Sequence, residues 1–72
     1  MLTKEDKIQI INAHSKSLNY SKYNLQIDKI QENSKTAPDS ASIEVIDAQI
    51  SDIDKQLAAL DSELTAVNSL TE

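Results

Sequence analysis

IEVIDAQISDIDKQLAALDSELTAV, residues 43–67, is the most regular segment of this chain. Its apolar residues recur in alternating steps of three and four: Ile43, Ile46, Ile50, Ile53, Leu57, Leu60, Leu64 and Val67. Such steps average 3.5 residues, close to the 3.6 residues of an α-helical turn, so these side chains line one face of a helix. The segment predicts a coiled-coil helix that packs against a partner helix.

The chain is short for an independent domain. It has 72 residues, and a chain of this size buries only about 60% of its unfolded surface, so a lone monomer has marginal stability. Disulfides cannot add stability because the sequence contains no cysteine, and His14 is the only histidine available to a metal. We therefore expect one domain over residues 1–72 that is stabilised by association with another chain.

A first helix is expected over residues 4–34. The hydroxyl of Thr3 can accept a hydrogen bond from the amide of Asp6, and no Gly or Pro interrupts the sequence before Pro38. Serine and asparagine between residues 15 and 21 are weak helix formers, so a break there is the alternative to a continuous helix. A continuous helix is the favoured interpretation.

The apolar residues of this helix fall on two nearly opposite faces. One face, beside His14, carries Ile8, Ile11, Leu18 and Leu25. The other face, named here the outer stripe, carries Ala13, Tyr20, Tyr23, Ile27 and Ile30. Since one partner helix covers one face, we expect the first group to form a hairpin seam with the apolar residues of 43–67. The outer stripe is then expected to contact another subunit or another protein.

A turn is expected over residues 35–39, followed by a second helix over residues 40–70. Pro38 cannot continue the first helix and holds the residue before it in an extended conformation. Asp39 or Ser40 can cap the second helix, and a capping box of Thr36 with Asp39 is the alternative. Two helices of nearly equal length joined by a short connection predict an antiparallel hairpin.

An acidic flank of three aspartates borders the seam, and the lysines of the first helix test its register. The acidic flank consists of Asp47, Asp54 and Asp61, each seven residues from the next. If residue numbers facing each other add to about 76, the expected pairs are Lys29 with Asp47, Lys22 with Asp54, and Lys16 close to Asp61. Exposed ion pairs contribute only about 0–1 kcal/mol each, so they select the register more than they stabilise it.

Composition argues against several partners. The chain has 12 acidic and 7 basic residues, a net charge of -5, and all the basic residues are lysines. Binding to DNA, RNA or an anionic membrane is disfavoured, because such surfaces select basic patches, often with stacked aromatic side chains. There is no apolar run of about 18 residues, and the charged residues 4–7 precede only a short apolar group without a cleavage site. We expect a cytoplasmic protein, in the host cytoplasm if it is viral.

We also expect no enzymatic activity, cofactor or metal site. Residues seven apart on a helix lie about 10.5 Å apart along its axis, too far to share an ion at ligand distances of about 2.0–2.6 Å. One histidine is a poor basis for a catalytic triad. The absence of glycine excludes Gly-rich phosphate loops and a Gly-x-Ser-x-Gly nucleophile elbow.

The sequence thus predicts an all-α, coiled-coil-like antiparallel two-helix hairpin that self-associates into a helical bundle, as a dimer or a trimer. Its expected role is structural: a homo-oligomer, or a subunit docked on a larger assembly. The alternative is an inhibitor or adaptor that binds a basic protein surface through the acidic flank, by charge complementarity or by nucleic-acid mimicry. In its size, its lack of Gly, Cys and Arg and its acidic hairpin pattern, the chain resembles small accessory or assembly proteins of bacteria and their viruses.

Overall fold

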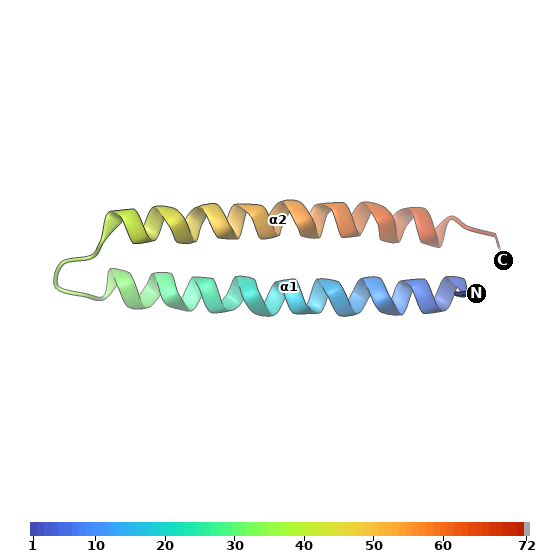
Figure 1. Ribbon diagram of the computed structural model, residues 1–72, viewed down its shortest axis with the longest axis horizontal. Helices are drawn as coiled ribbons and strands as arrows, with labels where there is room; N and C mark the ends of the chain where they lie inside the picture. The colour runs from blue at the N-terminus through green and yellow to red at the C-terminus, as the bar shows by residue number, and fades with distance from the viewer. Residues whose placement is uncertain (72) are drawn as a thin grey trace.

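The computed structural model describes residues 1–71, which form two antiparallel helices lying side by side (Figure 1). Helix α1 spans Lys4–Asn33 and helix α2 spans Ser40–Asn68. The described residues contain no strand, so the all-α class and the packing of two helices against each other are confirmed. Glu72, the last residue of the expected domain, lies outside the described residues.

The hairpin is a thin rod. Its extents are 57 × 15 × 15 Å and its radius of gyration is 16.6 Å, whereas a compact globule of this length has a radius of gyration of about 11 Å. Only Ile11, Ile53 and Val67 are buried, with exposed fractions of 8%, 9% and 4%, among the described residues. The core is therefore a single seam between the two helices.

Helix α1 begins with the expected cap and continues without a break. The Thr3 hydroxyl accepts a hydrogen bond from the Asp6 amide at 3.0 Å, which confirms that prediction, and the Asp6 carboxylate accepts one from the Thr3 amide at 3.1 Å. The run from 15 to 21 is helical, so the alternative of a broken helix is wrong. Leu18 lies half-buried in the middle of this run and attaches it to the seam.

Asp39 caps helix α2. Its carboxylate accepts hydrogen bonds from the Ala41 amide at 3.0 Å and from the Ser42 hydroxyl at 2.9 Å. These two hydrogen bonds lower the pKa of Asp39. Of the caps left open by the sequence, Asp39 is the one found, and Thr36 lies outside the helix.

Glu32 fastens the turn, a role that the sequence analysis missed. Its carboxylate pairs with the Lys35 ammonium at 2.6 Å and accepts a hydrogen bond from the Asp39 amide at 2.8 Å. The contact with Lys35, followed by that with the Asp39 amide, lowers the pKa of Glu32, and the same ion pair raises the pKa of Lys35. The side chain of Glu32, at the end of α1, thus holds Asp39, the residue that caps α2.

Acid is expected to loosen this turn. The ordinary pKa values are 4.5 for Glu32 and 3.8 for Asp39, and folding lowers both. Their contacts therefore stabilise the turn above the unfolded-state pKa values, and this contribution is lost as the pH falls through the lower folded-state values. Hydrogen-exchange protection of the Asp39 and Ala41 amides should hold above the ordinary pKa values of Glu32 and Asp39 and decline as the pH falls below them.

Glu32→Gln is the matched control for this acid effect. The variant removes the titrating group that faces the Asp39 amide but leaves the Asp39 carboxylate that faces the Ala41 amide. Protection of the Asp39 amide should then lose most of its pH dependence, while that of the Ala41 amide keeps it. If the pH profile of the Asp39 amide were the same in Glu32→Gln as in the native chain, the assignment of the Glu32 contact would be wrong.

Candidate interaction surfaces

The predicted members of the hairpin seam come together between the helices. On α2 the eight residues from Ile43 to Val67 at alternating three- and four-residue steps are all buried or half-buried, and so are Ile8, Ile11, Leu18 and Leu25 on α1. The inward row of α1 also includes polar members: Lys22 and Lys29, which the sequence analysis paired with aspartates of α2, and Lys4, Ser15 and Glu32, which it missed. The whole row runs through Lys4, Ile8, Ile11, Ser15, Leu18, Lys22, Leu25, Lys29 and Glu32.

Two of the three expected ion pairs are confirmed. Lys29 contacts Asp47 and Lys22 contacts Asp54, each with a nitrogen–oxygen distance of 2.7 Å. Lys16 was expected only close to Asp61, and no ion pair joins these two among the described residues. Lys29 and Lys22 occupy inward positions seven residues apart, and the next such position toward the N-terminus is Ser15. Lys16 is the neighbouring residue and lies exposed.

The outer stripe lies on the side of α1 that faces away from α2. Tyr20, Tyr23 and Ile30 have exposed fractions of 65%, 63% and 60%. Ala13 is also exposed and Ile27 is half-buried. These residues form an apolar row on an otherwise polar face.

Lys16 interrupts this row at a regular position. Together with Asn19, Tyr20 and Tyr23 it lines an open groove on the surface of α1. With Lys16 included, the row from 13 to 30 follows the alternating three-and-four spacing of a second coiled-coil seam. Helix α1 thus has two coiled-coil faces, and only the inner one has a partner within the described chain.

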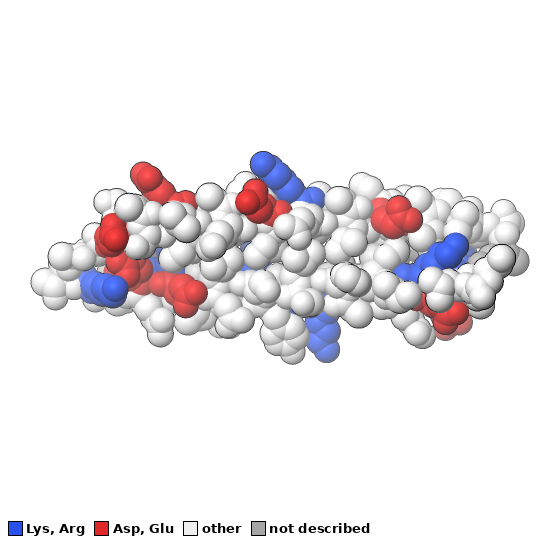
Figure 2. Space-filling model, viewed as in Figure 1, with Lys and Arg blue, Asp and Glu red and all other residues white. Residues whose placement is uncertain are grey.

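The two helices carry very different charge. Helix α2 has one lysine, Lys55, and six carboxylates, so its net charge of -5 equals that of the whole chain. The carboxylates are Glu44, Asp47, Asp52, Asp54, Asp61 and Glu63. Helix α1 has five lysines and four carboxylates, for a net charge of +1. In Figure 2 the middle of the α1 side is white apart from one blue side chain, while red side chains lie along the α2 side.

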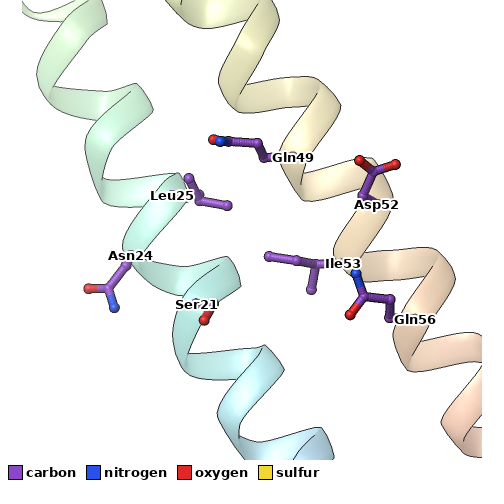
Figure 3. Close-up of a pocket in the computed structure, with 7 residues that line it drawn as sticks. All are labelled: Ser21, Asn24, Leu25, Gln49, Asp52, Ile53 and Gln56. Atoms are coloured by element: carbon purple, nitrogen blue, oxygen red, sulfur yellow. The ribbon is translucent and has the colours of Figure 1, made fainter.

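A shallow groove follows one flank of the seam (Figure 3). Its volume is about 450 Å³, and its lining residues come from both helices: Ser21, Asn24 and Leu25 from α1, and Gln49, Asp52, Ile53 and Gln56 from α2. Leu25 and Ile53 point toward one another between the helices (Figure 3). The groove is open to solvent, whereas small-molecule sites usually enclose most of the ligand surface.

His14 lies beside the adjoining groove, with Ser17 and Leu18 on α1 and Gln56 on α2. Among the described residues no group of three or more His, Asp or Glu side chains is placed to hold a metal ion. Neither described helix is long and apolar enough to cross a membrane. Among the described residues, the outer stripe carries three of the exposed large apolar side chains, Tyr20, Tyr23 and Ile30.

Comparisons with protein families, with curated proteins and with solved structures found no match to this chain.

Proposed function

We propose that the chain is a non-enzymatic structural protein whose hairpins associate through the outer stripe into a homo-oligomeric bundle. The observation that carries this proposal is the amount of exposed surface. The hairpin exposes 5338 Å², whereas a compact monomer of 8.0 kDa exposes about 4,450 Å². The excess of about 900 Å² is close to the roughly 800 Å² that each partner contributes to a standard interface.

The chemistry of the outer stripe supports this use. Tyr20 and Tyr23 each present a large ring with a polar hydroxyl at its end, and such residues are enriched in protein interfaces. With Ile27 and Ile30 they give α1 a second apolar face beside uncharged asparagine and glutamine residues. Docking of the same face on a different protein of a larger assembly is the related possibility.

The acidic flank supports a second, weaker candidate, an inhibitor or adaptor that binds a basic protein surface. The charge of α2 favours it, but the carboxylates of Asp47 and Asp54 are engaged by lysines of α1. Replacing Asp47, Asp54 and Asp61 by asparagine would abolish binding to a basic partner under this candidate. The same replacements should leave association through the outer stripe intact.

Sedimentation at micromolar concentration tests self-association. The native chain is expected to sediment as a dimer or larger oligomer. Tyr20→Ala with Ile27→Ala should weaken association at least about tenfold, since interface hot spots are enriched in Tyr and cost about 2 kcal/mol or more when truncated. The matched control is Ile10→Ala with Val45→Ala, which removes exposed apolar side chains outside the outer stripe. A monomeric native chain, or equal weakening by both double variants, would overturn the proposal.

A further inference from the structure

We infer that the occupant of the outer stripe is the same helix, α1, of a second copy, running antiparallel so that facing residue numbers add to 43. This inference rests on the self-association proposed above and adds the partner surface, its direction and its register. Tyr20 then faces Tyr23 of the second copy, and Ala13 faces Ile30 of the second copy. The result is a layer of four helices in which the two α1 helices are central.

The spacing of the stripe allows this pairing. The positions 13, 16, 20, 23, 27 and 30 are symmetric about the midpoint between Tyr20 and Tyr23. A two-fold rotation about that midpoint superimposes the row on itself, which makes an isologous interface that closes at two subunits. It also places the smallest residue of the row, Ala13, against the exposed Ile30 of the second copy.

Lys16 selects the antiparallel direction. In a parallel pair with equal register, the two Lys16 ammonium groups would face each other inside the contact. In the antiparallel pair, Lys16 faces Ile27 of the second copy, so the two lysines are 11 residues apart along the helix axis, about 16.5 Å. That separation exceeds the screening length of about 8 Å at physiological ionic strength.

The charges of the two helices favour contact through α1. Two α2 helices, each with a net charge of -5, would repel one another. The positions that flank the outer stripe between 12 and 31 are mostly uncharged: Asn12, Asn19 and Gln26 on one side, and Ser17, Asn24 and Gln31 on the other. In the proposed layer the acidic α2 helices lie on the outside, separated by both α1 helices.

Cysteine cross-linking tests the register, and the native chain has no cysteine to interfere. The double variant Ala13→Cys/Ile30→Cys should oxidise in a glutathione buffer to a covalent dimer with two disulfides. Its two cysteines lie about 25 Å apart on one helix, so they cannot bond within a chain. Each single variant should stay uncross-linked. Lys16→Cys with Ile27→Cys provides an independent pair at the same register.

The products separate this inference from the proposal on which it rests. The register is overturned, while self-association stands, if the native chain sediments as a dimer but a single-cysteine variant cross-links. The same holds if both double variants fail to cross-link. A ladder of larger covalent species overturns the closed two-fold pair. A native chain that remains monomeric overturns both. Circular dichroism of each variant, compared with the native chain, shows that the variants tested are folded.

Discussion

Ile11→Ala is expected to lower the free energy of unfolding by about 2–4 kcal/mol, the usual loss when a buried isoleucine is truncated. Ile11 is one of three buried residues in the described chain. A domain of this size has a total stability of about 4–11 kcal/mol, so this single change removes a large share. Thermal and urea unfolding followed by circular dichroism measure the effect, at one fixed protein concentration because association adds to apparent stability.

The adjacent residue provides the control for this prediction. Ile10 is 46% exposed, whereas Ile11 is 8% exposed. Ile10→Ala makes the same chemical change and the same change in helix propensity on the same helix, so the two variants differ in burial alone. We expect Ile10→Ala to cost less than about 1 kcal/mol. Equal losses for the two variants would show that α1 does not present this face to α2.

Lys22→Glu is expected to cost about 1–2 kcal/mol, the second largest effect. It removes the 2.7 Å ion pair with Asp54 and replaces attraction by repulsion of similar size. The inward position of Lys22 on α1 brings the new carboxylate close to the acidic flank, which increases this repulsion. Urea unfolding at low ionic strength gives the largest signal, because salt screens exposed charges.

Reversing both charges should restore most of the lost free energy of unfolding. In Lys22→Glu/Asp54→Lys the opposite charges face each other again, so the coupling free energy of the two sites is favourable. Lys55→Glu changes the net charge equally at an exposed lysine of α2 and controls for the global charge. If the double reversal were as unstable as the two single changes combined, the register of the hairpin would be wrong.

Much of this architecture could be predicted because the decisive signals are local and periodic. The heptads of residues 43–67 specify one helix face, Pro38 requires a turn, and the spacing of lysines against aspartates specifies the register, as the Lys22 and Lys29 ion pairs confirm. Each signal works at short range along one helix or across one pair of facing residues. None of them depends on the details of side-chain packing.

The features that were missed depend on three-dimensional placement. The heptad pattern of the inward row of α1 was recognised only at its apolar members, because Ser15, Lys22 and Lys29 occupy apolar-type positions and blur the pattern. Lys22 and Lys29 are tolerated there because their ammonium groups reach the carboxylates at the seam edge. Glu32 was missed because its partner is the backbone amide of Asp39, and a sequence does not display backbone contacts.

The position of the buried residues along the rod has a consequence for how the chain folds during synthesis. Near the turn, the inward row of α1 is interrupted by Lys29 and Glu32, while Ile11 and Val67 are buried toward the open end of the hairpin. Two of the three buried residues in the described chain thus lie far apart in sequence, and closing the chain between them costs entropy before their packing stabilises it. A nascent chain on the ribosome should therefore gain the packing of Val67 only after residue 67 has emerged.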